Sequence, residues 1–513
     1  MTRLALLSAS DKTGIVDLAK TLTSEFGFDI LSSGGTALTL QQAGIEVTKV
    51  SDYTGFPEIL GGRVKTLQPR IHGGILARPD QAADLDDLTR NDIRPIELVV
   101  VNLYPFEQTV ANPDTTLTEA IEKIDIGGPT LLRAAAKNHA HVTVLCDPQQ
   151  YKSYLAEMRD HNGQPTLEFR TRCACQVFAH TASYDQAITG YFTAQTGESS
   201  SRFALGGTQK QTLRYGENPH QPATWYQTGS QPSGWAAADK LQGKELSYNN
   251  LVDLEAARRI IAEFPRDSAP AAAVLKHTNP CGVALGSSLA EAYQRAFAAD
   301  NVSAFGGIVA LNQPVDEATA QALTQTFLEC VVAPGCDEAA AAILAKKKNL
   351  RVLILPEPDQ GPRQTIKAIA GGFLTQASDD LIADTAAWQF VTERQPSEKE
   401  LADMLFAWRI VKHVKSNAIV IGKGNVTLGI GAGQMNRVGA AKIALEQAGD
   451  LAQGAVLASD GFFPFDDSVR TAAAAGIRAI VQPGGSIRDQ DSIAAANELG
   501  LTMALTGTRH FLH

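Results

Sequence analysis

The N-terminal part of the sequence alternates short apolar runs with longer amphipathic segments, and this alternation is its strongest constraint on folding. Short segments rich in apolar residues, at 4–7, 28–31, 98–101 and 141–145, have the length of buried strands. Segments with a helical pattern, such as 15–25, follow several of them. Parallel strands need a crossover between them, usually a helix. The pattern therefore predicts a doubly wound parallel α/β sheet.

Two of the expected strand-to-helix turns have the same character. Residues 8–14 read Ser-Ala-Ser-Asp-Lys-Thr-Gly, and residues 32–36 read Ser-Ser-Gly-Gly-Thr. Free backbone N–H groups and the helix dipole favour a phosphate at such turns, and Lys12 adds positive charge. The alternative for each turn is an ordinary helix cap. Side by side, the two turns predict a phosphate site.

Four further stretches carry candidate chemistry in this part of the chain. Glycines flank the basic side chains at 61–66 and 69–74, which suits close approach to an anionic ligand, although a basic surface loop is the alternative. Tyr104 follows the strand at 98–101, where a phenol can donate to a developing oxyanion. The stretch 124–129 opens a helix that places Arg133 and Lys137 four residues apart on one face.

In the second half, residues 274–283 read Val-Leu-Lys-His-Thr-Asn-Pro-Cys-Gly-Val. The apolar run 271–275 predicts a buried strand, and 279–282 predicts a turn. Lys276 and His277 then lie at a strand end, where open α/β sheets present their chemistry. A lysine can stabilise negative charge and a histidine can move a proton near neutral pH. The alternative is a solvated loop.

Composition restricts the class of protein. A chain of 513 residues suggests two to four domains, and a net charge of −10 argues against nucleic-acid or anionic-membrane partners. The six cysteines include no CxxC pair, which favours a reducing, cytoplasmic compartment. We read the apolar start as a first strand rather than a signal peptide, and we find no run of the ~18 apolar residues that a membrane span needs.

The Ser- and Gly-rich stretch 196–202 predicts a boundary between domains 1–198 and 199–513. After it, 213–221 combines guanidinium, phenol and amide groups that suit a sugar phosphate, although an ordered loop is the alternative. The stretch 243–250 precedes a helix that we expect Asp253 to cap.

The second half also shows signs of internal repetition. Lys276-His277 with Asn279 resembles Lys412-His413 with Asn417, and aromatic turns follow at 303–307 and 459–465. We interpret this as two related α/β lobes with a boundary at about 365–400 and a ligand between them. Chance similarity of short strings is the alternative.

A zinc site is not predicted. Pro280-Cys281 is half of the zinc-deaminase pattern, which requires H-x-E and P-C-x-x-C. Position 284 is alanine, and no His-x-Glu precedes it in this half.

Several long motifs resemble one family. They lie at 10–14, 33–36, 54–57, 61–66, 102–106, 124–128 and 131–139. Together they resemble the bifunctional purine-biosynthesis enzymes that join an IMP cyclohydrolase to an AICAR transformylase, and the similarity runs from residue 4 to 513. It implies a methylglyoxal-synthase-like N-terminal fold and a two-lobed, cytidine-deaminase-like transformylase domain. It also implies a cytoplasmic homodimer that catalyses the last two steps of de novo IMP synthesis.

For ring closure, the resemblance implies a catalytic set of Lys65, Tyr104, Asp125 and Lys137. Lys137 would be the nominal catalytic group, Asp125 would orient the carboxamide and Tyr104 would face the formyl oxygen. Gln68 stands where the family carries histidine, and an amide cannot titrate. The implied nucleotide contacts are Ser10, Asp11, Lys12, Ser33, Gly34, Gly35, Thr36, Arg63, Val64, Thr66, Val101, Asn102, Ile126 and Gly127.

For formyl transfer, the resemblance implies 10-formyltetrahydrofolate as co-substrate and no metal. His277 would carry the proton, Lys276 would stabilise charge and Asn417 would orient the formyl group. The C-terminal segment 508–513 would lie in the active site. The implied AICAR contacts are Arg214, Tyr215, Phe305, Gly306, Glu329 (where the family carries aspartate) and Arg509. The implied folate contacts are Arg437, Val438, Phe462, Asp467, Ser486 and Ile487.

Two other classes of protein remain alternatives. Methylglyoxal-synthase-like domains also act as regulatory ligand sensors, which would bind a nucleotide without turnover. A zinc deaminase would hold a bound metal. The set Lys65, Tyr104, Asp125 and Lys137 favours catalysis, because a sensor needs no such set.

Overall fold

The computed structural model describes residues 2–197, 203–229 and 231–513, and the chain divides into two compact units, Met1–Gly206 and Gly207–His513. The boundary predicted between residues 198 and 199 lies outside the described residues. Among the residues described, no helix is both long and apolar enough to span a membrane.

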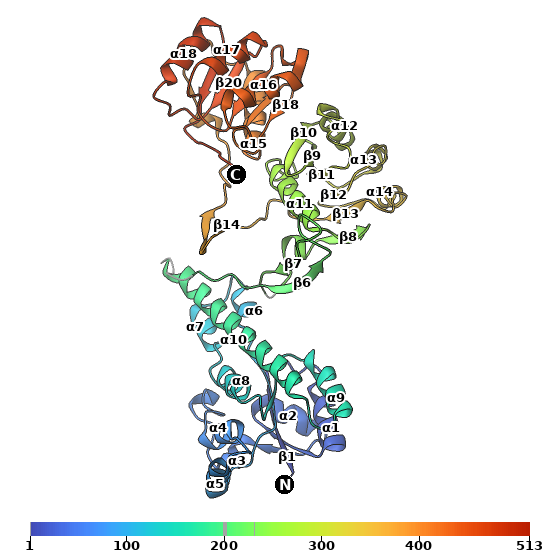
Figure 1. Cartoon of the computed structure of the whole chain (residues 1–513), viewed down its shortest axis with the longest axis vertical. Coiled ribbons are helices and arrows are strands. Elements are labelled where there is room, and N and C mark those ends of the chain that lie inside the picture. The colour runs from blue at the N-terminus through green and yellow to red at the C-terminus, as the bar shows by residue number, and fades with distance from the viewer. Residues whose placement is uncertain (1, 198–202, 230) are drawn as a thin grey trace. The chain divides into compact units, whose positions relative to one another are not determined.

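The N-terminal unit, which carries the labels α1 to α10 in Figure 1, is built on one parallel sheet. This sheet has five strands in the order β3-β2-β1-β4-β5. This confirms the predicted doubly wound sheet. The strands are β1 Arg3–Ala9, β2 Phe28–Ser32, β3 Val47–Lys49, β4 Leu98–Asn102 and β5 Thr143–Leu145. The helices are α1 Ile15–Phe26, α2 Gly34–Gln42, α3 Val50–Thr54, α4 Pro69–Leu76, α5 Ala82–Arg90, α6 Phe106–Val110, α7 Leu117–Glu122, α8 Gly127–Lys137, α9 Gln150–Asp160 and α10 Leu167–Thr196.

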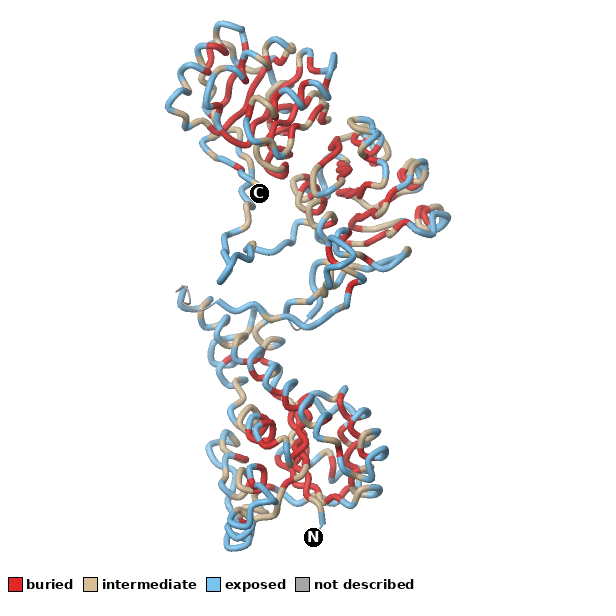
Figure 2. The backbone as a smooth tube through the Cα atoms, viewed as in Figure 1, coloured by how far each residue is buried: buried red, intermediate tan, exposed pale blue. Residues whose placement is uncertain are grey.

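The central strands of this sheet are buried along most of their length (Figure 2). β4 is a continuous apolar run from Leu98 to Val101 because helices cover both faces of a doubly wound sheet. α8 packs on β4 and β5, and α10 packs on α8. Because β2, β1 and β4 are parallel neighbours, their polar carboxyl-terminal ends meet at one edge of the sheet.

The C-terminal unit contains two six-stranded sheets with the same topology, in the orders β10-β9-β11-β12-β13-β8 and β18-β17-β19-β20-β21-β16. The first lobe contains β8 Asp239–Gln242, α11 Tyr248–Ile261, β9 Ala271–Lys276, β10 Asn279–Leu285, α12 Leu289–Ala299, β11 Ile308–Leu311, α13 Glu317–Leu323, β12 Cys330–Ala333, α14 Glu338–Leu344 and β13 Arg351–Ile354. The second contains β16 Gln389–Phe390, α15 Glu398–Val411, β17 Ile419–Gly422, β18 Thr427–Gly431, α16 Arg437–Ala448, β19 Val456–Ser459, α17 Asp467–Ala474, β20 Ala479–Gln482, α18 Asp489–Glu498 and β21 Thr502–Leu505. Two hairpins complete the unit, β6 Thr208–Leu213 with β7 Ala223–Gln227 and β14 Gln364–Ile369 with β15 Gly372–Ala377.

The topology gives a different correspondence from the predicted repeat. Lys276 and His277 end β9 and begin its turn into β10, so their counterparts are Lys423 and Gly424 between β17 and β18. Lys412 and His413 follow α15 instead. Likewise, 303–307 precedes β11 whereas 460–465 follows β19. The predicted correspondence between Lys276-His277 and Lys412-His413 was wrong, because a two-residue match does not show in which strand or helix the residues lie.

Two local predictions also need correction. Asn279 to Gly282 belong to β10 rather than to a turn, because His277 and Thr278 reverse the chain alone with positive φ values of 53° and 63°. Ser247, not Asp253, caps α11, since its side chain accepts from the N–H of Asn250.

The two lobes share a close approach of a strand to the following helix. A Cβ on Gly282 of β10 would overlap the carbonyl oxygen of Ala296 in α12. A Cβ on Gly429 of β18 would overlap the carbonyl oxygen of Ala444, at the same position of α16. Only glycine allows these backbones to pack so closely.

Gly429→Ala should therefore destabilise the C-terminal unit by about 1–3 kcal/mol, the usual cost of overpacking a core. All four tryptophans (225, 235, 388, 408) lie in this unit, so tryptophan fluorescence during urea unfolding measures its stability. Gly372→Ala is the control, because a Cβ there meets open space. Equal unfolding midpoints for the two variants would contradict the packing argument.

A buried charged cluster joins the two lobes. Glu263, after α11, accepts from Lys412 Nζ at 2.5 Å and lies 2.9 Å from Nε2 of His413, after α15. Burial lowers the pKa of His413, against the hydrogen bond to Glu263, and keeps the ring neutral. Burial raises the pKa of Glu263, but the hydrogen bond with His413 and the charge of Lys412 outweigh it and lower that pKa.

This cluster predicts acid sensitivity of the C-terminal unit. Below the ordinary histidine pKa of about 6.5 the unfolded chain binds a proton that buried His413 does not, so stability falls as pH falls. The slope for one proton reaches about 1.4 kcal/mol per pH unit. Stabilisation by the lowered pKa of Glu263 is lost only below the usual glutamate range, so this loss does not overlap the range of about pH 5–6.5 in which His413 acts. Urea unfolding followed by tryptophan fluorescence should give a flatter pH dependence for His413→Gln, and equal slopes would contradict the assignment.

Candidate active sites

The first candidate site lies where β1, β2 and β4 end. Thr36 Oγ1 accepts from the N–H of Ala9 and donates to its carbonyl oxygen, both at 3.0 Å, which fixes the start of α2 against the end of β1. The side-chain amide of Asn102 pairs with the backbone of Asp11 through two bonds of 2.8 Å. The two predicted phosphate turns and the end of β4 are thus held together.

Two lysines converge on the start of α2. Lys65 Nζ lies 3.2 Å from the position of a Cβ built on Gly34, and Lys12 Nζ lies 3.7 Å from that of Gly35. Ser33 is the N-cap residue, but its side chain makes no capping hydrogen bond. The first N–H groups of α2 and two ammonium groups therefore point to the same region, which suits a phosphate. Glu58 lies 3.4 Å from Lys65 Nζ.

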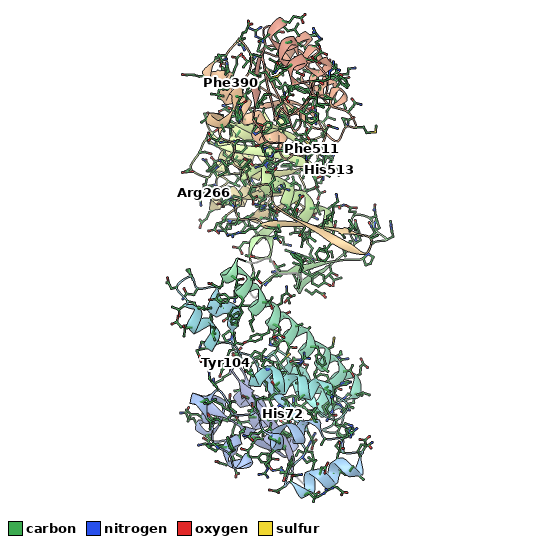
Figure 3. The ribbon with its side chains drawn as sticks, turned by 90° about the vertical axis from the view of Figure 1, so that its left-hand side faces the viewer. His72, Tyr104, Arg266, Phe390, Phe511 and His513 are labelled. Atoms are coloured by element: carbon green, nitrogen blue, oxygen red, sulfur yellow. The ribbon has the colours of Figure 1, made fainter. Side chains whose placement is uncertain are left out.

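The loop before α8 brings Asp125 to the same edge. Its carboxylate accepts from the N–H of Gly128 at 2.8 Å, and burial raises its pKa against the hydrogen bonds from the backbone of Gly128, Tyr104 and Gly127. A Cβ on Gly127 would lie 3.0 Å from Thr66 Oγ1, so loop 61–66 reaches the start of α8. The Tyr104 side chain is 46% exposed beside this loop (Figure 3).

Tyr184 of α10, which is not among the predicted site residues, supports this loop. Its hydroxyl accepts from the N–H of Asp125 at 2.9 Å and donates to the carbonyl oxygen of Lys123 at 3.1 Å. No sequence signal distinguishes Tyr184 from other aromatic residues of a long helix.

The structure does not bring Lys137 beside the other members of the predicted catalytic set. Lys137 ends α8, about 15 Å along the helix axis from Gly127 at 1.5 Å per residue. The adjacent Asn138 donates to the carbonyl oxygens of Ile75 and Ala77 at the end of α4. Lys137 therefore lies at the opposite edge of the sheet from Asp125.

The other residues considered for this site lie in loop 61–66 and at the start of α4. Arg63 forms an exposed ion pair of 2.6 Å with Glu122. Gln68 precedes α4 as its N-cap residue and makes no side-chain cap. His72, one turn into α4, has a buried Nε2 with no hydrogen-bond partner.

The second candidate site is built around the β9–β10 turn. Lys276 Nζ donates to the carbonyl oxygen of Phe305 at 2.9 Å, and the exposed His277 occupies the first position of the turn. Asn279 Oδ1 accepts from the N–H of Lys415 at 3.3 Å. The turn of the first lobe thus lies beside residues 415–417 of the second lobe.

α11 connects this turn to the loop after β6. Asn249 Nδ2 donates to the carbonyl oxygen of Glu217 at 3.4 Å, and Asp253, four residues later on the same helix face, accepts from the N–H of Thr278 at 2.8 Å. This loop carries Arg214 and Tyr215, so two predicted AICAR contacts approach the His277 turn through α11.

Asn417 is held by a buried ion pair. Its Oδ1 accepts from Arg437 at 2.7 Å, and its Nδ2 donates to the carbonyl oxygen of Gln434 at 2.8 Å. The Arg437 guanidinium also pairs with Asp460 and donates to Ser459 Oγ at 2.8 Å. The Arg437 side chain is only 5% exposed, and it holds the Asn417 amide in place. Its contact with folate stays a prediction.

The C-terminal segment lies against the same residues. The N–H of Ser416 donates to the carbonyl oxygen of Leu512 at 2.9 Å, and the N–H of Leu512 donates to Ser416 Oγ at 3.1 Å. Phe511 and His513 flank Leu512 in the sequence, and their ring centroids are 5.9 Å apart (Figure 3). The chain end is therefore docked next to Asn417.

The remaining predicted contacts of the second site lie on surfaces of both lobes. Phe305 is exposed and lies 5.4 Å from the ring of Phe327, Gly306 has a φ of 73°, and Glu329 accepts from Arg351 at 2.7 Å. Arg509 lies over the ring of Phe511.

The predicted folate contacts all lie in the second lobe. Val438 is in the first turn of α16, and Asp467 opens α17. Phe462 and Ile487 are exposed, and Ser486 donates its N–H to Asp489 at 3.2 Å. Among the described residues there is no cluster of three or more histidine, cysteine, aspartate or glutamate side chains able to hold a metal ion.

Comparison with known proteins assigns both units to one family. The sequence model of the AICARFT/IMPCHase bienzyme matches residues 135–447, and that of the MGS-like domain matches residues 14–130. Proteins named bifunctional purine biosynthesis protein PurH are 69% identical in Nostoc punctiforme, 68% in Rippkaea orientalis and 67% in Synechococcus elongatus, each over 100% of both chains. A crystal structure of ForH is 38% identical and covers 37% of this chain and 98% of its own, with a TM-score of 0.33. This chain belongs to the AICARFT/IMPCHase bienzyme family of purine biosynthesis.

Proposed function

We propose that the two units of this bifunctional enzyme each perform one of its two reactions. The C-terminal unit transfers the formyl group of 10-formyltetrahydrofolate to the 5-amino group of AICAR. The N-terminal unit then closes the formamido-AICAR ring to IMP with loss of water. The observation that carries the proposal is the placement of Lys276 and His277 beside the Lys415–Asn417 segment of the other lobe.

In the transfer step, the amine nitrogen of AICAR bonds to the formyl carbon and the bond from that carbon to folate N10 breaks. The amine is conjugated with its ring and weakly basic, so His277 removes its proton as it attacks, and a proton returns to N10 of the leaving folate. Lys276 stabilises the negative charge on the formyl oxygen. The Asn417 amide, held by Arg437, orients the formyl group.

In ring closure, the carboxamide nitrogen attacks the formyl carbon and the former formyl oxygen leaves as water. An amide is a poor nucleophile, so orientation and stabilisation of the oxyanion dominate. Lys12 and Lys65 bind the phosphate at the start of α2, Tyr104 donates to the formyl oxygen and Asp125 orients the carboxamide. Lys137, at the opposite end of α8 from Asp125, is assigned no step in this proposal.

Lys65→Met tests the nucleotide site. Loss of one charge-assisted contact of about 1.5–3 kcal/mol should raise the KM for formamido-AICAR about 10–100-fold. The measurement is IMP formation from supplied formamido-AICAR. Lys20→Met is the matched control, because Lys20 is an exposed lysine on α1 of the same unit, and its KM should stay unchanged. An unchanged KM for Lys65→Met would remove this lysine from the site.

The same assay decides between an enzyme and a ligand sensor. A sensor would bind formamido-AICAR without forming IMP.

The proposal also includes a cytoplasmic homodimer, which rests on the family resemblance. Light scattering on the purified chain gives its mass directly, and a mass of one chain would contradict the dimer.

A further inference from the structure

The turn that carries His277 is held in an unfavourable backbone conformation. His277 and Thr278 both have positive φ, at 53° and 63°. This left-handed region is uncommon for residues other than glycine, and such residues persist only where the surroundings hold them. In the first lobe the surroundings include Asp253 of α11, whose carboxylate accepts from the N–H of Thr278 at 2.8 Å.

The second lobe contains the same hydrogen bond from a turn to a helix carboxylate, but its turn carries no histidine. Asp403 is the sixth residue of α15, as Asp253 is the sixth of α11, and both helices have 14 residues. Asp403 Oδ1 accepts from the N–H of Asn425 at 2.9 Å, in the equivalent β17–β18 turn. There the residue that corresponds to His277 is Gly424, with a φ of 63°.

The supporting carboxylate is common to both lobes, whereas the imidazole occurs only in the turn of the first lobe. The carboxylate and the turn occur in both lobes, so they belong to the shared fold. Gly424 adopts its positive φ without a steric penalty, whereas His277 adopts the same conformation at a cost. The first lobe therefore places an imidazole at a position where the fold favours glycine.

We propose that Asp253 is a positioning residue for formyl transfer, because it fixes the left-handed turn that presents the His277 imidazole to the substrate amine. The inference rests on the proposed role of His277. Burial raises the pKa of Asp253, against hydrogen bonds from the backbone of Thr278 and His277 and the nearby imidazole. Asp253 itself does not touch the reacting atoms.

The positioning role gives a specific pattern of kinetics. Asp253→Ala removes the acceptor, so the turn relaxes and the imidazole moves; a displacement of about 1 Å at a reacting group can cost about 100-fold. We expect the kcat of formyl transfer to fall about 10–100-fold, with the KM for AICAR within about threefold and ring closure unchanged. Asp253→Asn keeps the side-chain oxygen and should retain kcat within about threefold.

A second substitution separates positioning from general destabilisation. In Asp253→Ala/Thr278→Gly, glycine favours the positive φ and restores the turn without the carboxylate, so kcat should rise at least about fivefold above that of Asp253→Ala. Asp403→Ala is the matched control, since it removes the same support from the turn that lacks a histidine, and its kcat should stay within about threefold of the parent enzyme. Circular dichroism confirms that each variant is folded before assay.

The outcomes are distinct. The inference is overturned if Asp253→Ala keeps its kcat, if Asp253→Asn loses as much as Asp253→Ala, or if Thr278→Gly fails to restore the rate. His277→Ala is assayed in parallel. If that variant retains formyl transfer, the proposed function fails; if it is inactive while Asp253→Ala is normal, only the positioning role fails.

Discussion

His277→Ala should lower the rate of formyl transfer by about 10²–10⁴-fold, the usual contribution of a general base, and leave ring closure unchanged. No other histidine occupies this turn, and Lys276 cannot replace it because its ammonium donates to the carbonyl oxygen of Phe305. The measurement is a pair of assays on one preparation, one with AICAR and 10-formyltetrahydrofolate and one with formamido-AICAR.

The control for this prediction separates the imidazole from the turn. Asparagine tolerates the left-handed conformation better than most residues, so His277→Asn keeps the turn without a group that titrates near neutral pH. We expect it to be as inactive as His277→Ala. Formyl transfer by His277→Asn at the parental rate would show that the turn matters and the proton carrier does not.

Arg437→Met should destabilise the C-terminal unit by about 3–5 kcal/mol, the usual cost of removing one partner of a buried ion pair. The Asp460 side chain is fully buried and would lose its cation, and Asn417 would lose the donor that orients its amide. Formyl transfer should fall as well, because the amide is then free to rotate. Urea unfolding followed by tryptophan fluorescence measures the first effect.

Arg488→Met is the matched control for this prediction. Arg488 pairs with Asp491 at 2.6 Å, but both side chains are about half exposed. Exposed ion pairs contribute about 0–1 kcal/mol, so the control should unfold close to the parent protein. Equal destabilisation of the two variants would contradict the buried role of Arg437.

The N-terminal fold and part of its site followed from the sequence because they depend on local patterns. Apolar runs and strand-to-helix turns predicted the parallel sheet and placed Lys12 and Gly34 at the same edge. The separation of Lys137 from Asp125 was implicit in the helix predicted to start at 124–129, but the family resemblance grouped both residues in one catalytic set.

The C-terminal unit was harder to predict because its key contacts are long-range. The backbone pairing, not the repeated Lys-His string, defines which residues of the two lobes correspond. Asp253 was interpreted as a helix cap, whereas it binds a turn 25 residues away in the sequence. The support of Asn417 by Arg437 and Asp460 likewise brings together three elements that no local pattern connects.

The central claim is that two separate sites on one chain act on the same purine precursor in succession. Mixing two variants tests it most directly: His277→Ala, defective in formyl transfer, and Lys65→Met/Asp125→Ala, defective in ring closure. With AICAR and 10-formyltetrahydrofolate supplied, each variant alone should form little IMP, and the mixture should form IMP readily because the formylated intermediate made by one is closed by the other. A mixture no more active than either variant alone would contradict the claim.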